Sequence, residues 1–147
     1  MLSDTKVEIK INTNTSVIPT KGSKEAAGYD LYADEFAHIM PGETRAVDCG
    51  IAIKIPTGFY GKIAGRSGLA LFNSIFVQGG IIDSDHRGNV RVILHNASSE
   101  TFHVAKQARI GQIIIMRHAI VDWEEYQGTN VDWITLRGED GFGSTGA

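Results

Sequence analysis

The chain has 147 residues, 42% hydrophobic and 21% charged, which is the balance of one soluble globular domain with a sizeable core. Its net charge of −3 excludes a protein that is basic overall, and we expect no nucleic-acid partner. An anionic ligand would therefore need a local basic site. Cys49 is the only cysteine, which excludes an internal disulfide and a multi-cysteine zinc site.

The first ten residues are polar and mixed, and they lack the apolar core of a signal peptide. No apolar run approaches the roughly 20 residues that a transmembrane helix needs. We therefore expect no membrane partner. A single cysteine suits a reducing compartment, and the predicted location is intracellular, in the cytoplasm or the nucleus.

Short segments rich in Val, Ile and Phe alternate with clusters of Gly, Asn, Asp and Ser, a pattern typical of an all-β sandwich or barrel. In chain order, strands are predicted at residues 7–11, 29–32, 43–48, 51–55, 59–64, 75–77, 90–96, 102–104 and 110–118. Turns are predicted at residues 41–42, 56–58 and 87–89, and one short helix at residues 68–72. No βαβ alternation is present, which argues against a doubly wound nucleotide-binding fold.

The C-terminal fifth of the chain has a different pattern. The triplet Val-Asp-Trp occurs at residues 121–123 and again at 131–133, and we predict a hairpin that turns near residues 128–130. The composition of residues 137–147, rich in glycine, predicts a flexible tail. We therefore expect a β domain at residues 1–136 and a tail at residues 137–147.

The segment 65–68 combines a tight glycine-flanked turn with an arginine and a serine. Such a turn can aim consecutive backbone N–H groups at an anion. Arg66 adds a planar bidentate donor and Ser67 a hydroxyl, both suited to phosphate oxygens. An ordinary surface turn is the alternative interpretation.

The segment 79–90 has two apolar arms around a polar turn, which predicts a β-hairpin. A hairpin can present backbone N–H and C=O groups to the edge of a base. Asp83 directly follows an apolar pair, and a carboxylate held there could take a proton from an attacking water. The alternative for Asp83 is a turn hydrogen bond with the following serine.

Two weaker segments also contain polar groups beside apolar runs. Asp30 lies among apolar residues, where a carboxylate needs a partner. Arg109 and Gln112 precede an apolar run and are consistent with a polar start to a core strand. The five histidines form no HxH or HExxH pattern, so the sequence argues against a histidine-bound transition metal. No nucleophile-elbow motif supports a Ser–His–Asp triad.

The tail offers a similar set of phosphate- and base-binding groups. Arg137 could bind a terminal phosphate, and the glycines of the tail would let the backbone approach a ligand closely. Phe142 could cover a nucleobase, since stacking on an aromatic ring contributes about 1–3 kcal/mol per base. A tail that closes over a nucleotide would exclude bulk water. A disordered end is the alternative.

These segments, in this order and spacing, resemble the five motifs of the homotrimeric dUTPase family. The matching residues are 26–32, 65–70, 80–89 with the strand that follows to 96, 109–113 and 137–146. Together they extend from Ala26 to the C-terminus. One motif is a weak signal, but five in register are a strong one.

The resemblance implies a jelly-roll-like β-barrel and a homotrimer in which three chains build each active site. The first, second and fourth motifs would come from one chain, the third from another and the fifth from the last. The implied activity is hydrolysis of dUTP to dUMP and pyrophosphate, by attack of water on the α-phosphorus. Such a reaction keeps uracil out of DNA and supplies dUMP for dTTP synthesis.

The resemblance also implies roles for individual residues. Asp83 would activate the water, and Asp30 would act on Mg²⁺ through water, which suits a cation that dehydrates reluctantly. Phe142 would cover the uracil. The residues implied to bind substrate are Arg66, Ser67, Gly68, Gly80, His86, Gln112, Arg137, Phe142, Gly143, Ser144 and Thr145.

Four positions depart from the usual family pattern. His86 stands where a tyrosine usually packs on the deoxyribose, and we hypothesise that rejection of UTP is weaker or pH-dependent here. Gly65 stands where proline is common, and Gly111 replaces a usual alanine. Arg91 stands where a small residue is frequent, and the sequence suggests no role for it.

Two other classes of function are compatible with the same fold. One is a dCTP deaminase or a bifunctional deaminase–dUTPase, although the segment after Asp83 and the tail fit the pyrophosphatase better. The other is a non-catalytic interaction or signalling module, although such proteins often lose motif residues that are intact here.

Overall fold

The fold is all-β, as the sequence predicts, and the computed structural model describes residues 5–143. Nine strands fall at predicted positions, with ends that differ by at most two residues. The strands are β1 Glu8–Ile11, β2 Tyr29–Tyr32, β3 Ala37–Ile39, β4 Thr44–Asp48, β5 Ile51–Lys54, β6 Phe59–Ala64, β7 Ile75–Gln78, β8 Ile81–Ile82, β9 Arg91–Asn96, β10 Phe102–Val104 and β11 Arg109–Arg117. The strands β3 and β8, of three and two residues, were not predicted separately.

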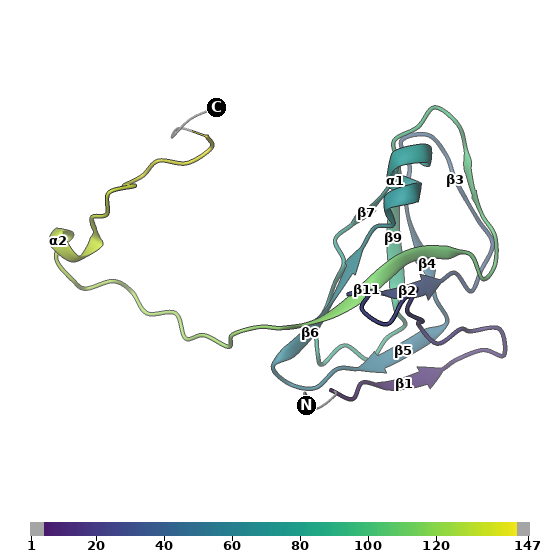
Figure 1. Cartoon of the computed structure of the whole chain (residues 1–147), viewed down its shortest axis with the longest axis horizontal. Helices are drawn as coiled ribbons and strands as arrows, with labels where there is room; N and C mark the ends of the chain where they lie inside the picture. The colour runs from purple at the N-terminus through teal and green to yellow at the C-terminus, as the bar shows by residue number, and fades with distance from the viewer. Residues whose placement is uncertain (1–4, 144–147) are drawn as a thin grey trace.

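The strands form four small antiparallel sheets that wrap around one core (Figure 1). A four-stranded sheet has the order β2-β11-β6-β8, and a three-stranded sheet has the order β4-β9-β7. The pairs β1-β5 and β10-β3 complete the barrel. The chain crosses repeatedly between sheets, which brings segments that are distant in sequence together along β11.

The core is aliphatic because the alternating positions of the strands that face inward are Ile, Val or Leu. The most deeply buried of these side chains are Leu31, Ile39, Val47, Ile51, Ile75, Val90, Val92, Leu94 and Ile110. Asn96 is the one polar residue among the buried side chains that are described. Its amide donates to the carbonyls of Ile39 and Glu100, at 2.8 and 2.7 Å, and so joins β3 to the loop between β9 and β10.

The short helix predicted at residues 68–72 is confirmed as α1, Ser67–Asn73. It begins after the extended residue Arg66 and ends at Ser74, whose left-handed backbone (φ 53°) turns the chain into β7. No residue of α1 is buried, so the helix lies on the surface of the barrel. In the described part of the chain, no helix is both long and apolar enough to cross a membrane.

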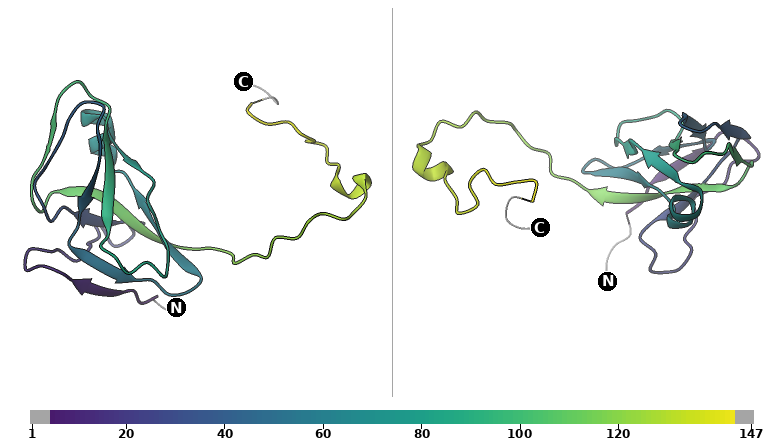
Figure 2. Two further views of the ribbon diagram at one scale, coloured as in Figure 1. Left: turned by 180° about the vertical axis from the view of Figure 1, so that it is seen from behind. Right: turned by 90° about the horizontal axis from the view of Figure 1, so that it is seen from above.

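The C-terminal arm, residues 118–143, extends away from the barrel in all views (Figures 1 and 2). The hairpin predicted near residues 128–130 is wrong: the only regular element described there is the one-turn helix α2, Asn130–Trp133. Tyr126 packs on Trp133 and donates a hydrogen bond to the carbonyl of Thr129, so the two Val-Asp-Trp triplets flank a local turn.

The hairpin predicted for residues 79–90 is also wrong. The first apolar arm, β8, pairs with β6, whereas the second arm continues into β9, which pairs with β4 and β7. Residues 83–89 therefore form a loop between two different sheets. The physical reason is that each arm is apolar enough to join a separate sheet, so no pairing between the arms is needed.

Candidate functional site

Asp30 is the centre of a polar cluster at one edge of the four-stranded sheet. Its backbone N–H donates to the carbonyl of Thr20, at 2.6 Å, so β2 is also held on the side that faces away from β11. One carboxylate oxygen lies 3.8 Å from Nε of Arg66, and the other lies 3.7 Å from a terminal nitrogen of Arg109. The carboxylate is 19% exposed, so two cations are held side by side at a partly shielded surface.

Arg66 reaches this cluster from the turn between β6 and α1. Its guanidinium also lies 3.4 Å from the carbonyl oxygen of Arg109, a weak donor contact that holds the side chain across β11. Ser67 and Gly68 follow as the first residues of α1, where backbone N–H groups have no acceptor within the helix. The predicted residues Arg66, Ser67 and Gly68 therefore lie together.

Gln112 joins the same cluster because it is the direct partner of Asp30 on β2 and of Ala64 on β6. Its side-chain amide donates to the carbonyl of Gly65, at 2.9 Å, which fixes the turn before Arg66. Gly28 makes this possible, since a Cβ at that position would overlap the side-chain amide of Gln112. The segments around Gly28, Gly65 and Gln112 thus form one unit.

Asp83 lies elsewhere, after β8 at the opposite edge of the same sheet. Three strand spacings separate β2 from β8, which is about 14 Å across the sheet. Asp83 is exposed and lines a shallow hollow of about 240 Å³ with Tyr60, Ile81 and His118. Within one chain, the predicted catalytic carboxylate and the phosphate-binding cluster do not meet.

Gly80 and His86 flank Asp83 on either side. Gly80 has φ +95°, and a Cβ there would lie 2.6 Å from the carbonyl oxygen of Ile63, so the position requires glycine. The carbonyl of Gly80 accepts from the N–H of Ile63, at 2.7 Å, and anchors the start of the segment to β6. His86 is exposed on the loop at residues 83–89, and its N–H donates to the carbonyl of Asp83, at 3.1 Å.

The predicted tail residues lie far along the C-terminal arm. Arg137 donates from Nε to the carbonyl of Asp140, at 2.9 Å, within a local turn. Phe142 is fully exposed, and Gly143 follows it with φ 79°. Ser144 and Thr145 lie outside the described residues.

A larger groove, of about 860 Å³, does not coincide with the polar cluster. It lies along β1, β5 and β11, and its lining is mostly apolar but includes Lys21 and Lys24. Its lining includes Ile9, Ile53, Phe59, Ile113 and Ile115. The groove offers few groups to a triphosphate, so the cluster around Asp30 is the better candidate site.

Among residues 5–143, no group of three or more His, Cys, Asp or Glu side chains is arranged to hold a metal ion. Asp30 supplies one carboxylate at the cluster, and both of its oxygens face arginines. A single carboxylate cannot complete the coordination sphere of a metal ion by itself. One carboxylate does fit Mg²⁺, which commonly binds through one or two carboxylates, water and substrate phosphates.

Sequence reasoning missed two contributors to this site. The sequence pattern indicates only the polar start of a strand at Arg109, yet this residue is the second cation on Asp30. Gly28 gave no signal of its own, because its role depends on Gln112, which is 84 positions further along the chain. The clue available in the sequence was that Asp30, a carboxylate among apolar residues, needs a partner.

Comparison with known proteins places these observations in a family. A family profile described as dUTPase matches residues 14–146. The deoxyuridine 5'-triphosphate nucleotidohydrolase of Mus musculus is 48% identical over 128 residues, which are 87% of this chain and 77% of that protein. The enzyme of the same name from Debaryomyces hansenii is 38% identical over 144 residues, 98% of this chain and 89% of that protein.

Solved structures show the same fold. The dUTPase of Staphylococcus bacteriophage 80alpha, solved with dUPNHPP, matches with a TM-score of 0.89. The match covers 97% of this chain and 99% of that chain at 22% sequence identity. At this identity the likeness speaks for the fold alone, and it confirms the prediction of a jelly-roll-like barrel.

Proposed function

The chain belongs to the dUTPase family, and we propose that it hydrolyses dUTP to dUMP and pyrophosphate. The observation that supports this most directly is the convergence of three separate segments on one cationic cluster. Arg66 and Arg109 stand on either side of Asp30, beside Gln112 and the start of α1. Paired planar guanidinium groups bind the oxygens of a triphosphate and stabilise the charge that grows on them during displacement.

In the proposed reaction, Asp83 accepts a proton from the water that attacks the α-phosphorus. Its exposure in a shallow hollow leaves room for water and for the phosphate of a substrate that a neighbouring chain binds. The phosphate oxygens are held by Arg66, Ser67, Gly68 and Gln112, and the terminal phosphate by Arg137. Phe142 covers the uracil, and Gly143, Ser144 and Thr145 close the tail at residues 137–147 over the substrate.

Mg²⁺ would be held mainly by the phosphates, with Asp30 contacting it through water. When bound, the ion neutralises charge on the phosphate oxygens and orients them for in-line attack. The chain itself contributes the carboxylate and the two arginines that hold this carboxylate in place.

A homotrimer explains why the parts of the site are separate in one chain. The C-terminal arm exposes several large apolar side chains, among them Trp123, Val131, Ile134 and Leu136. Exposed apolar surface of this extent is typical of an interaction site. We propose that three chains exchange these arms, so that each active site takes the Asp30 cluster from one chain, Asp83 from another and Phe142 from the third.

Selectivity for uracil would come from the backbone of residues 80–89, which can match the donor and acceptor pattern of the base. A mismatched donor leaves buried polar groups unpaired, and this discriminates more strongly than a lost methylene group. His86 would face the sugar. Because imidazole is smaller than phenol and can form a hydrogen bond, we expect weaker rejection of UTP, and His86→Tyr should strengthen it.

The test is pyrophosphate release with Mg²⁺ from dUTP, UTP, dCTP and dTTP, with Asp83→Asn as the control. Turnover of dUTP that depends on Asp83 supports the proposal. Release of ammonia from dCTP would instead favour a deaminase. A folded protein that binds nucleotides but releases no pyrophosphate would favour an interaction module. We propose the cytoplasm or the nucleus as the place of action, where dUTP and DNA are found.

A further inference from the structure

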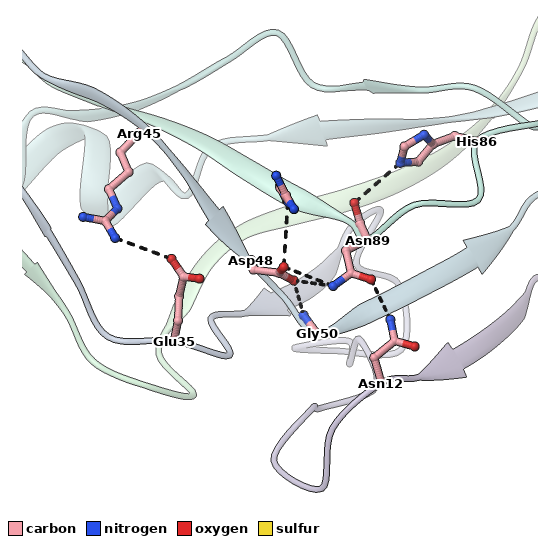
Figure 3. Close-up of polar contacts among 8 residues, drawn as sticks. Asn12, Glu35, Arg45, Asp48, Gly50, His86 and Asn89 are labelled. Atoms are coloured by element: carbon pink, nitrogen blue, oxygen red, sulfur yellow. Dashed lines mark hydrogen bonds and ion pairs between the residues drawn. The ribbon is translucent and has the colours of Figure 1, made fainter.

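A second polar network, separate from the Asp30 cluster, lies beside the loop that carries Asp83 and His86. Its centre is Asp48, the last residue of β4, whose side chain is 25% exposed (Figure 3). Asp48 itself lies outside the five motifs, and the proposed function assigns it no role. We propose that Asp48 is a positioning residue that holds the loop at residues 83–89 in place by clamping Asn89.

The first support is the number of donors that converge on the carboxylate. The side-chain nitrogen of Asn89 lies 3.0 Å from each oxygen of Asp48. The N–H of Gly50 donates to one oxygen at 2.7 Å, and Nε of Arg91 lies 3.7 Å from the other. Hydrogen bonds to an ionised acceptor are the stronger kind, so Asn89 is held firmly and in one orientation.

Asn89 links this clamp to the rest of the loop and to the N-terminal segment. Its side-chain oxygen accepts from the amide of Asn12, at 2.7 Å. Its backbone carbonyl lies 3.5 Å from Nε2 of His86, as Figure 3 shows. His86 is tied in turn to the backbone of Asp83. A short chain of contacts therefore runs from Asp48 to both residues of the proposed site.

The loop has little else to hold it. Asp83, Asp85, His86 and Arg87 are exposed, and Arg87 donates only to carbonyls within the loop. In the described part of the chain, Asn89 makes every side-chain hydrogen bond that joins residues 83–89 to another element. A loop without apolar anchors depends on such bonds for its position.

The clamp also gives Arg91 a role that the sequence did not suggest. Arg91 stands where relatives often have a small residue, and it lies beside the carboxylate of Asp48 from the next strand, β9. It places a positive charge next to a carboxylate that already accepts from two nitrogens, the side-chain amide of Asn89 and the backbone N–H of Gly50. Arg91 therefore adds an ion pair to the contacts that hold the carboxylate of Asp48 in place.

This inference rests on the proposed function, and steady-state kinetics test it in the full-length protein. We expect Asp48→Ala to lower kcat/KM for dUTP on the order of tenfold, since small misplacements of a catalytic group have large effects on rate. We also expect the ratio of kcat/KM for dUTP over UTP to fall, because His86 moves with the loop. Asp48→Asn keeps one acceptor oxygen and the size of the side chain, so its effect should be smaller.

The matched control is Glu35→Gln, which breaks the ion pair of Glu35 with Arg45 of β4 at 3.8 Å. Arg45 lies on the same strand as Asp48, and the Glu35–Arg45 pair lies away from the loop (Figure 3). We expect the kinetics of Glu35→Gln to equal those of the wild type. A double variant, Asp48→Ala with Asn89→Ala, should be no slower than Asn89→Ala alone, because Asp48 acts through Asn89.

Two outcomes would overturn the inference. One is an active wild type whose Asp48→Ala and Asp48→Asn variants keep its kcat/KM and its dUTP/UTP ratio. The other is a double variant whose losses add, which would show that Asp48 acts independently of Asn89. A wild type without dUTP turnover would instead remove the proposed function. Hydrogen exchange then still tests the clamp, because Asp48→Asn must speed exchange of the amides at residues 84–88.

Discussion

The two edges of the four-stranded sheet hold their functional groups in different ways. At the β2 edge, Asp30, Arg66 and Gln112 come from three separate segments and are joined by hydrogen bonds and ion pairs. At the β8 edge, Asp83 stands on an exposed loop with no partner from the first group. One edge is thus already assembled in a single chain, whereas the other lacks the groups with which it is proposed to act.

The difference shows which functions one chain can perform alone. In the proposed site, the assembled edge binds phosphate with charges that the sheet fixes before a ligand arrives. The proposed part of the β8 edge is to supply a proton acceptor to another chain, and that of the C-terminal arm is to supply Arg137 and Phe142. Binding in a single chain and catalysis in a trimer are therefore separable properties.

The largest expected effect concerns Asp83. Asp83→Asn should lower kcat by roughly 10²–10⁴-fold, the usual contribution of a general base. A mixture of two impaired variants, Asp83→Asn and Arg66→Gln, should become more active than either variant alone after the chains are exchanged. With equal amounts and random exchange, about a quarter of the sites would take Asp83 from a chain that keeps Asp83 and Arg66 from a chain that keeps Arg66.

The two variants are mixed, partly unfolded and refolded together. Pyrophosphate release is then measured to detect the exchange of chains. The control is each variant taken through the same treatment alone. No recovery, in a mixture shown to contain mixed oligomers, would mean that each site lies within one chain. The separation of the two edges would then have another explanation.

The second effect concerns the assembled edge itself. Arg66→Gln removes a charged donor, and a hydrogen bond to a charged group contributes about 1.5–3 kcal/mol. We therefore expect kcat/KM to fall roughly ten- to a hundredfold. The melting temperature should change little, because Asp30 keeps its ion pair with Arg109. Arg45→Gln, a second exposed arginine with an ion pair, is the matched control and should leave the kinetics unchanged.

The sequence predicted the strands well because alternating Ile and Val residues, bounded by Gly, Asn and Pro, are local signals. It could not predict which strands pair. The apolar arms at residues 79–90 looked like a hairpin, and their separation into two sheets depends on β6 and β4, which are distant in sequence. The convergence of Gly28, Gly65 and Gln112 is likewise a property of the fold, and the resemblance to a family pointed to it where local patterns did not.

The arm supplies a third, smaller effect. Phe142 is fully exposed in the single chain, so Phe142→Ala should leave the melting temperature of the protein unchanged. Loss of base stacking costs about 1–3 kcal/mol, so we expect KM for dUTP to rise on the order of tenfold. Phe142→Trp keeps an aromatic face and should restore most of the affinity. An unchanged KM would remove Phe142 from the substrate site and leave the arm with a role in assembly alone.

The smallest effect concerns the barrel that carries both edges. Burial raises the pKa of the Cys49 thiol to about 12, from an ordinary value of 9.0, and the nearby charges of Asp48, Asp34 and Glu35 add to the shift. The folded state therefore keeps a proton that the unfolded state loses above about pH 9. This contribution to stability is complete below pH 9 and is lost as the pH rises towards 12.

Alkylation of Cys49 should consequently be slow and should follow global unfolding, whereas a cysteine introduced at Ile120 of the arm should react at once in the single chain. In the assembled trimer, the arm cysteine should become protected while Cys49 keeps its slow rate. Labelling both positions at increasing protein concentration measures this difference directly. If the arm cysteine stays reactive when the protein is trimeric, the chains do not exchange arms. A different contact between chains must then bring the Asp30 cluster and Asp83 together.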